Sequence, residues 1–133
     1  MKELITYKQY GNLVNELVEK IREGIDVSKL KLIYTFMRGG SPIAVHLSHY
    51  LDLPVLTDET DYYFPAGGCD KILVVDDIAD TGKTLDGFQF LFPTATLFYK
   101  PRSIVIPTFY SKEVPSNVWV VMPWERSDEE PNR

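Results

Sequence analysis

Apolar positions follow a helical period in some stretches of the chain and form unbroken runs in others. In residues 10–21, apolar side chains recur every three or four positions, which is typical of an amphipathic helix packed on a sheet. The capping box Thr6-x-x-Gln9 precedes this stretch, and Gly24 follows it as a stop signal. The pattern predicts a first helix that packs on the sheet and carries no chemistry.

Short apolar runs rich in β-branched residues predict the strands, with further helices between them. The predicted strands are 30–36, 54–56, 72–75, 95–99, 104–110 (interrupted by Pro107) and 118–122. Helices are expected at 41–51, where Ser41 is the N-cap and Pro42 the first helical residue, and at 84–91, which Pro93 ends. This alternation predicts an α/β fold, a mostly parallel twisted sheet flanked by helices.

The most distinctive group of polar residues follows the run 72–75. Asp76 and Asp77 come directly after this buried strand, and a short loop with Asp80, Thr81 and Gly82 leads to the next expected helix. Open α/β sheets bind ligands outside the carboxyl ends of their strands, where N–H groups of loops and helix starts favour a phosphate. The two carboxylates can accept hydrogen bonds from the hydroxyls of a sugar that carries this phosphate. The polarity of the stretch therefore fits a ribose 5-phosphate.

A P-loop for nucleoside triphosphates is the competing interpretation, because Gly82-Lys83-Thr84 matches the end of that motif. The P-loop requires a glycine five residues before Gly82. Position 77 is instead an aspartate, whose carboxylate would face the triphosphate. We therefore reject the P-loop.

A second anion site is indicated at Arg38-Gly39-Gly40, between a predicted strand and a predicted helix. Glycines let a backbone approach a ligand closely, and the guanidinium of Arg38 can pair with an anion. The same residues also suit a plain tight turn from strand to helix, and the pattern alone leaves both interpretations open.

Composition is that of a globular protein with one domain. The 133 residues suit a domain spanning 1–126, with a polar tail at 127–133. A formal net charge of −5 argues against non-specific nucleic-acid binding. No apolar run is long enough for a membrane span, and Met1-Lys2-Glu3 begins no signal peptide, so we expect a cytoplasmic protein with no membrane partner.

Three residues that could carry chemistry are assigned none. Cys69 is the only cysteine, which excludes an internal disulfide and a thiolate metal cluster. His46 and His49 lie three residues apart on the expected second helix, but they lack a third ligand at a diagnostic spacing. We interpret both histidines as structural.

Residues 72–84 resemble the phosphoribosyl-pyrophosphate motif of the type I phosphoribosyltransferases. That motif is an apolar strand, two acids, two further residues and then Asp-Thr-Gly-x-Thr, and every position is met here. The Arg-Gly-Gly segment is similar to the pyrophosphate loop of the purine members, which carries a non-proline cis peptide, here implied between Met37 and Arg38. The resemblance covers residues 6–125 and implies the type I phosphoribosyltransferase fold with a reduced hood.

The C-terminal part resembles bacterial xanthine-guanine and hypoxanthine phosphoribosyltransferases most. Phe98-Tyr99-Lys100-Pro101 is similar to the segment whose lysine donates to the 6-oxo group of the purine. Residues 117–125 resemble the end of these enzymes, which implies that Trp119 stacks on the purine and that the backbone of Val120 meets its 2-position.

The resemblance implies a glycosyltransferase of purine salvage. Such an enzyme moves ribose 5-phosphate from phosphoribosyl pyrophosphate to guanine, xanthine or hypoxanthine and releases pyrophosphate. Asp76 and Asp77 would hold the ribose hydroxyls, and Asp80 would accept or share the proton of the purine N7. These three aspartates are the implied catalytic residues.

The remaining implied contacts concern the phosphates, the metal and the assembly. Arg38 would bind the pyrophosphate with its two glycines. Mg²⁺ is the implied cofactor, held mostly through substrate and water beside Asp76, Asp77 and Glu125. The family is commonly dimeric or tetrameric, so a homo-oligomer is expected. The implied cradle for the 5-phosphate is Thr81, Gly82, Lys83 and Thr84.

One segment departs from the family's pattern. The irregular stretch 57–70 corresponds to the mobile hood loop, but it is short, acidic and without lysine or arginine. The family's loop usually carries a Ser-Tyr pair and basic residues, and Tyr62-Tyr63 is the nearest match here. Two alternatives therefore stay open: transfer to another acceptor base, and a non-catalytic sensor of phosphoribosyl pyrophosphate. The preferred purine and the oligomeric state are also open.

Overall fold

The computed structural model describes residues 1–125. Its helices are α1 (Tyr7–Gly24) and α2 (Ser41–Leu51), with short 3-10 turns η1 (Val27–Lys29) and η2 (Phe88–Phe90). Its strands are β1 (Lys2–Leu4), β2 (Leu32–Thr35), β3 (Val55–Thr57), β4 (Ile72–Ala79), β5 (Thr94–Tyr99), β6 (Phe109–Glu113) and β7 (Trp119–Val121). The predicted tail at 127–133 lies outside the described residues.

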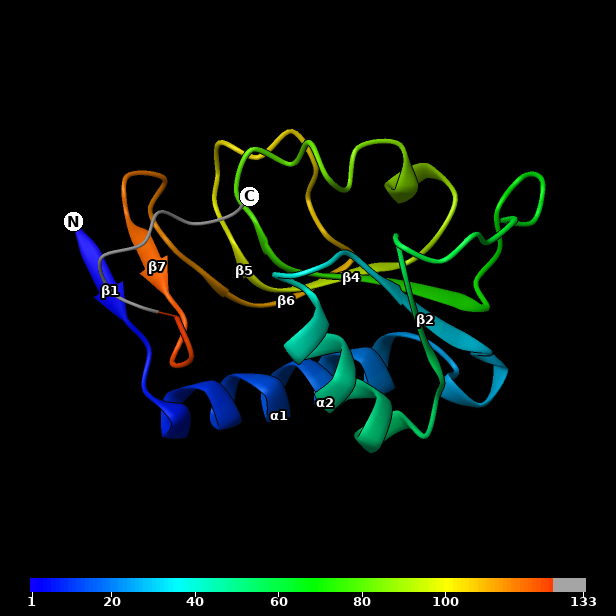
Figure 1. Ribbon diagram of the computed structural model, residues 1–133, viewed down its shortest axis with the longest axis horizontal. Coiled ribbons are helices and arrows are strands. Elements are labelled where there is room, and N and C mark those ends of the chain that lie inside the picture. The colour runs from blue at the N-terminus through cyan, green and yellow to red at the C-terminus, as the bar shows by residue number, and fades with distance from the viewer. Residues whose placement is uncertain (126–133) are drawn as a thin grey trace.

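Five strands form one parallel sheet in the order β3-β2-β4-β5-β6 (Figure 1). From β2 the chain passes through α2 to β3 on one side, whereas β4, β5 and β6 extend the sheet on the other side. The strand order therefore reverses between β2 and β4, which is the point where open α/β sheets bind their ligands. The predicted α/β fold with a mostly parallel sheet is confirmed.

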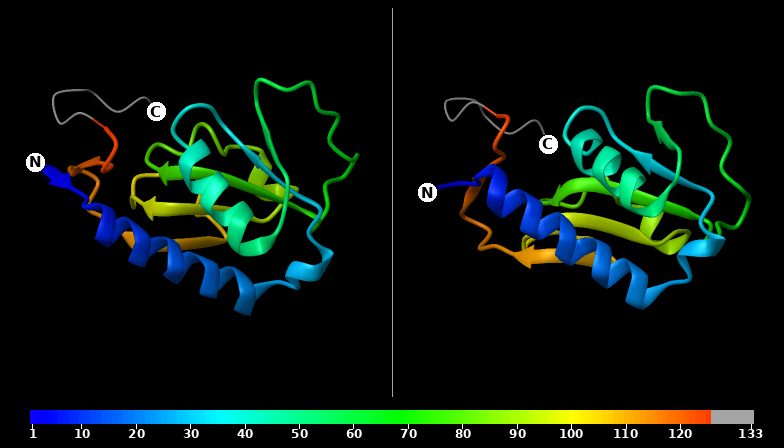
Figure 2. Two further views of the ribbon diagram at one scale, coloured as in Figure 1. Left: turned by 60° about the horizontal axis from the view of Figure 1, so that its bottom comes forward. Right: turned by 90° about the horizontal axis from the view of Figure 1, so that it is seen from below.

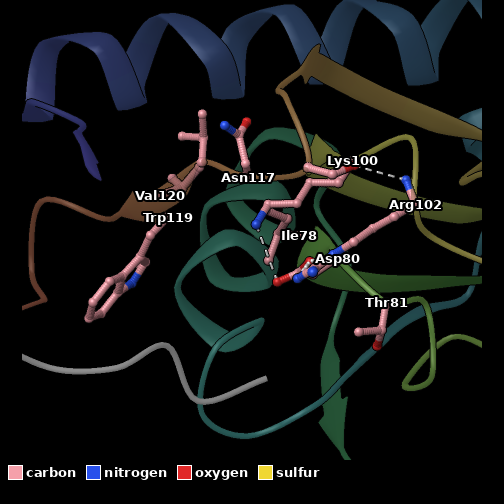
Figure 3. A pocket seen from close by; sticks show the side chains of 10 residues that line it. Ile78, Asp80, Thr81, Lys100, Arg102, Asn117, Trp119 and Val120 are labelled. Carbon is pink, nitrogen blue, oxygen red and sulfur yellow. Dashed lines mark hydrogen bonds and ion pairs between the residues drawn. The ribbon is translucent and has the colours of Figure 1, made fainter. Parts of the chain in front are cut away.

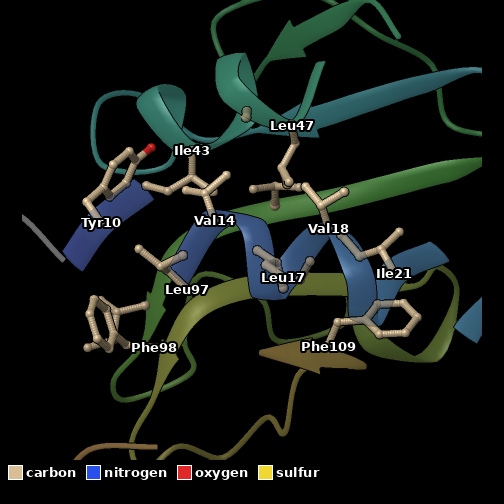
Figure 4. Packing of buried hydrophobic residues seen from close by; sticks show 14 of the residues in the cluster. Tyr10, Val14, Leu17, Val18, Ile21, Ile43, Leu47, Leu97, Phe98 and Phe109 are labelled. Atoms are coloured by element: carbon tan, nitrogen blue, oxygen red, sulfur yellow. The ribbon is translucent and has the colours of Figure 1, made fainter. Parts of the chain in front are cut away.

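Helices α1 and α2 cover one face of this sheet (Figures 1 and 2). The predicted capping box is present at the start of α1, where Thr6 accepts from the Gln9 N–H and the Gln9 side chain accepts from the Thr6 N–H. The apolar stripe of α1 packs against α2, β5 and β6 (Figure 4). Its buried residues are Tyr10, Val14, Leu17, Val18 and Ile21. Burial of this apolar stripe stabilises the packing of α1 on the sheet.

The other face is covered by irregular segments and an aromatic cluster instead of a helix. The helix expected at 84–91 is wrong: residues 83–87 form turns, and only η2 follows. Gly87 has a φ of +98°, which breaks a right-handed helix. Pro93 would end any helix that began after Gly87, so only a short helical segment fits between the two residues. Phe88 and Phe92 pack with the ring of Phe64 rather than along a helical stripe.

Three further boundaries differ from the prediction. The strand expected at 104–110 begins only at Phe109, because Pro107 has no N–H to donate and Thr108 exchanges hydrogen bonds with the side chain and backbone of Thr94. The N-cap of α2 is Gly40, without a side-chain cap, and Ser41 is already helical. Strand β4 continues to Ala79, past both acids that were expected to follow it.

A short strand at the N-terminus was not predicted. β1 pairs in parallel with β7, with Lys2 opposite Trp119 and Glu3 opposite Val120. Three residues are too few to show a period in the sequence, and only the tertiary partner makes them a strand. Within residues 1–125, no helix combines the length and the apolar character that crossing a bilayer requires.

Candidate active site

Two buried carboxylates lie at the switch point between β2 and β4. The pairing of β2 with β4 ends at Val75, so Asp76 and Asp77 lie where the β2 chain has already turned away. Asp76 and Asp77 are 8% and 5% exposed, and each accepts from the backbone N–H of the next residue, at 2.9 Å in both cases. These hydrogen bonds orient the carboxylates at the edge of the sheet.

The Arg-Gly-Gly loop lies directly against these acids. The peptide bond from Met37 to Arg38 is cis, as the resemblance implies. A Cβ added at Gly39 would be 2.9 Å from Asp77 Oδ2, so only glycine permits this approach of loop to carboxylate. The loop and β4 therefore form one site, which supports the anion-site interpretation over a plain turn.

A first pocket of about 350 Å³ opens beside this loop. Arg38, Gly39 and Asp77 line it together with Trp124 and Glu125 from the end of the described chain. Glu125 accepts from the backbone N–H of Met122 at 2.8 Å, and this contact fixes its carboxylate. The pocket thus brings together a guanidinium and two acids that are far apart in the sequence.

Helix α1 supports the far wall of this first pocket. The Tyr10 ring meets the Trp124 ring edge-on, with centroids 4.9 Å apart. The Tyr10 hydroxyl lies 2.6 Å from His46 Nδ1, and burial raises the pKa of Tyr10, so this hydroxyl keeps its proton. His46 therefore has a structural contact, in line with its interpretation from the sequence.

The loop after β4 is tightly closed. Gly82 has a φ of +85°, and a Cβ there would be 2.8 Å from the Val105 nitrogen and 2.5 Å from Ser103 Oγ. Thr81 Oγ1 accepts from the Lys83 N–H at 3.3 Å, and its carbonyl accepts from the Ile104 N–H. The hollow lined by residues 78–85 and Asp76 measures only about 20 Å³, close to the space of one water molecule. A phosphate would therefore have to widen this loop.

A second pocket of about 470 Å³ lies on the other side of Asp80 (Figure 3). It brings together three of the residues predicted to contact the base, namely Lys100, Trp119 and Val120, with Asp80. Lys100 is buried at the end of β5, and its Nζ lies 3.4 Å from Asp80 Oδ2. The volume is within the range of pockets that hold small molecules.

Arg102 is a lining residue that sequence reasoning missed. Its Nε donates to Asp80 Oδ1 at 2.7 Å, and its Nη2 donates to the same oxygen. Figure 3 shows the Arg102 side chain running from the loop after β5 to Asp80. The signal was present in Lys100-Pro101-Arg102, because the second cation follows the first at the same end of a strand.

Sequence reasoning also missed Asn117, which lines this pocket, and Lys2, which does not line it but lies over the ring of Trp119. Lys2 Nζ lies 4.5 Å from the centroid of the Trp119 ring, because β1 pairs with β7 and the Trp119 N–H donates to the Met1 carbonyl. Asn117 lines the pocket between Lys100 and Val120 in Figure 3. Both depend on the pairing of β1 and on the turn before β7, which the sequence pattern did not reveal.

The reduced hood packs on the aromatic cluster. Between β3 and β4 the chain is irregular, as predicted. The Tyr62 ring meets Phe64 edge-on at 5.0 Å, whereas Tyr63 is 93% exposed. Asp58 accepts from the Met37 N–H at 2.9 Å, and burial together with the Asp58 charge raises the pKa of Tyr34. Tyr62 therefore serves packing, and Asp58 ties the hood to the Arg-Gly-Gly loop.

Among residues 1–125, carboxylates are the metal-ligand type that gathers at this edge of the sheet. Asp76 and Asp77 line one small pocket, and Asp77 shares another with Glu125. In the part of the chain that the structure describes, no group of three His, Cys, Asp or Glu side chains is close enough to hold a metal ion. Oxygen ligands of this kind suit Mg²⁺, which commonly keeps substrate and water ligands as well.

Comparisons with known proteins agree with the fold. No protein-family model matches the chain. A purine phosphoribosyltransferase from Pyrococcus horikoshii is 28% identical, with a TM-score of 0.75 over 99% of each chain. The xanthine-guanine-hypoxanthine phosphoribosyltransferase of Helicobacter pylori is 22% identical, with a TM-score of 0.76 over 93% of this chain and 92% of that one.

A third solved structure extends the likeness to a eukaryotic protein. The hypoxanthine-guanine phosphoribosyltransferase of Schistosoma mansoni, in complex with IMP, is 21% identical, with a TM-score of 0.63 over 84% of this chain and 67% of that one. The chain therefore has the type I phosphoribosyltransferase fold, and its resemblance to the purine members is confirmed. These structural neighbours are enzymes of pentosyl transfer.

Proposed function

We propose that this chain is a purine phosphoribosyltransferase that moves ribose 5-phosphate from phosphoribosyl pyrophosphate to a 6-oxopurine and releases pyrophosphate. One observation carries the proposal: two pockets lie on either side of the end of β4. One contains Arg38, Asp77 and Glu125, and the other contains Asp80, Lys100 and Trp119. A sugar seated on the acids of β4 would have its leaving group in the first pocket and the attacking base in the second.

In this proposal, the acids of β4 act on the ribose. Asp76 and Asp77 accept hydrogen bonds from its 2- and 3-hydroxyls, and their charge offsets the positive charge that develops on the ring in the transition state. The bond from C1 to the pyrophosphate oxygen breaks as a purine nitrogen forms its bond to C1. Arg38 stabilises the charge that develops on the leaving pyrophosphate, with Gly39 and Gly40 giving the loop its close approach.

The second pocket orients the base. Lys100 offers only donors, which suits a 6-oxo group and disfavours the 6-amino group of adenine. Asp80 takes or shares the proton of the purine N7 as the new bond forms. Trp119 stacks on the purine, and the backbone of Val120 meets its 2-position. The 5-phosphate lies in the loop from Thr81 to Thr84 once that loop has widened.

Mg²⁺ fits the carboxylates at this edge and would neutralise part of the charge on the pyrophosphate. Asp76, Asp77 and Glu125 would hold it through water and through the oxygens of the substrate, since no three-residue cluster occurs among residues 1–125. We also propose that residues 1–126 form the functional domain. A cytoplasmic location and a homo-oligomer stay predictions.

Turnover with a panel of purines tests the proposal. The measurement is kcat/KM for guanine, hypoxanthine, xanthine and adenine with phosphoribosyl pyrophosphate and Mg²⁺, following pyrophosphate release. We expect reaction with the oxopurines and little with adenine, because a site built around a hydrogen bond rejects an analogue that cannot form it. The variant Lys100→Ala should lose this preference, while Asp80 keeps Arg102 as a partner.

Other results would favour the alternatives. If adenine reacted as well as guanine in the wild type, Lys100 would not select the base. Turnover with a different acceptor base alone would point to another transferase of this fold. Tight binding of phosphoribosyl pyrophosphate without turnover of any base would point to a sensor, which the short acidic hood keeps as the main non-catalytic alternative.

A further inference from the structure

The second pocket carries more positive than negative charge, although the chain as a whole has a formal net charge of −5. Its lining includes two cationic side chains, Lys100 and Arg102, and one carboxylate, Asp80. A third cation, Lys2, lies over the ring of Trp119. Counted over residues 1–125, the charged side chains that line this pocket therefore have a net positive charge, opposite in sign to the chain as a whole.

The positive charge of Lys100 and the negative charge of Asp80 offset each other in this pocket. Their charged groups lie 3.4 Å apart, and the proposed reaction uses both, one for the 6-oxo group and one for N7. Arg102 has no part in that scheme. It is the residue that turns a neutral pair into a lining with net positive charge.

Arg102 is anchored at its backbone and at one end of its side chain. Its N–H donates to Ser116 Oγ at 3.1 Å, and two of its five N–H donors point at Asp80 Oδ1. The Arg102 side chain is 50% exposed, compared with 15% for Asp80 and 6% for Lys100. Its charge therefore lies on the solvent side of the buried pair.

We propose that Arg102 is a specificity-determining residue, which favours an oxopurine that carries a negative charge over a neutral one. The inference rests on the proposed function and deepens it. Among the three oxopurines, xanthine has a second oxo group and is the most acidic, so part of it is a monoanion near neutral pH, whereas guanine and hypoxanthine are neutral there. A cleft lined by one sign of charge concentrates ligands of the other sign, and such complementarity gives specificity.

The test compares kcat/KM for xanthine, guanine and hypoxanthine in four proteins at saturating phosphoribosyl pyrophosphate and Mg²⁺. These are the wild type, Arg102→Gln, Arg102→Lys and the control Arg22→Gln, which removes a guanidinium from the exposed side of α1. Ratios between bases are the readout, and Arg102→Lys is the control for a disturbance of Asp80, because it keeps the positive charge but not the paired contact of the guanidinium with Asp80.

We expect the ratio of xanthine to guanine to fall about fivefold in Arg102→Gln, the size of effect of one partly exposed charge. Arg102→Lys keeps the charge and should keep the ratio, and so should Arg22→Gln. The ratio of hypoxanthine to guanine should stay constant in all four proteins, since both bases are neutral.

Several results would overturn the inference. An unchanged ratio of xanthine to guanine in Arg102→Gln would do so, and so would an equal fall in Arg102→Lys, because charge would then not be the cause. If Arg102 contacted the 5-phosphate instead, KM for phosphoribosyl pyrophosphate would rise with every base and the ratio would stay constant. Absence of turnover with all three bases in the wild type would instead overturn the proposed function itself.

Discussion

The Asp80 carboxylate is held between two positively charged side chains, those of Arg102 and Lys100. Asp80 meets Arg102 at one oxygen and Lys100 at the other, so the proposed proton acceptor and the proposed 6-oxo donor lie beside each other. Asp77, by contrast, faces the backbone of Gly39, where an added Cβ would lie only 2.9 Å from the Asp77 carboxylate. The site thus separates the second pocket, which carries Lys100 and Arg102, from the acidic end of β4, where we propose that the sugar binds.

The role of Arg38 can be tested by comparing two ligands. Arg38→Ala should weaken phosphoribosyl pyrophosphate much more than the nucleotide product, because only the former carries the pyrophosphate that the guanidinium would pair with. The loss of a charge-assisted contact is worth about 1.5–3 kcal/mol, or about ten- to a hundredfold in Kd. Binding titrations of both ligands measure it.

A matched control for this titration is Arg22→Ala, since Arg22 is an exposed guanidinium that donates to the Tyr50 carbonyl outside both pockets. That variant should bind both ligands like the wild type. Equal weakening of the two ligands in Arg38→Ala would count against the pyrophosphate-loop interpretation.

Among the elements near the site, the loop after β4 has a backbone that requires glycine at position 82, where φ is +85°. A methyl group at Gly82 would meet the backbone nitrogens of Ile104 and Val105 at 2.9 and 2.8 Å. The loop therefore packs against the segment after β5, which also carries Arg102. If the loop widened for a phosphate, as the proposed function requires, it would have to move against this segment.

Gly82→Ala should lower both stability and turnover. Its backbone strain and close contacts should reduce the free energy of unfolding by about 1–3 kcal/mol, measured by urea denaturation. The control Gly87→Ala introduces the same kind of strain at a φ of +98° but meets nothing within 4 Å. Turnover should fall sharply in the first variant and stay near wild type in the second. Similar turnover in both would show that the loop's packing is irrelevant to the reaction.

The elements also show what a sequence pattern can and cannot predict. The stripe of α1, its capping box and the buried run of β4 are local signals, and they predicted the corresponding elements well. The helix expected at 84–91 failed because the side chains of Phe88 and Phe92 belong to an aromatic cluster whose other members, such as Phe64, come from the hood. Strand β1 was missed because it exists only through its pairing with β7.

For the whole molecule, the structure brings together the residues that the motifs singled out, whereas the apolar periodicity predicted the elements around them less completely. Asp76, Asp77, Arg38 and Glu125 were expected at one edge, and the structure places them in adjoining pockets. Arg102 follows Lys100 at the same strand end, but it was missed because its contact with Asp80 depends on where the loop after β5 lies in the fold. Long-range contacts of this kind determine the charge of the second pocket.

The central claim, that the acids of β4 hold a ribose during transfer, is tested most directly by the double variant Asp76→Asn with Asp77→Asn. An Asn oxygen can still accept from the backbone N–H of the following residue, so the fold should persist, as thermal unfolding would show. Nucleotide formation from guanine and phosphoribosyl pyrophosphate with Mg²⁺ should fall at least about a hundredfold, since two negative charges opposite the transition state are lost. Near-wild-type nucleotide formation by a folded double variant would contradict the account.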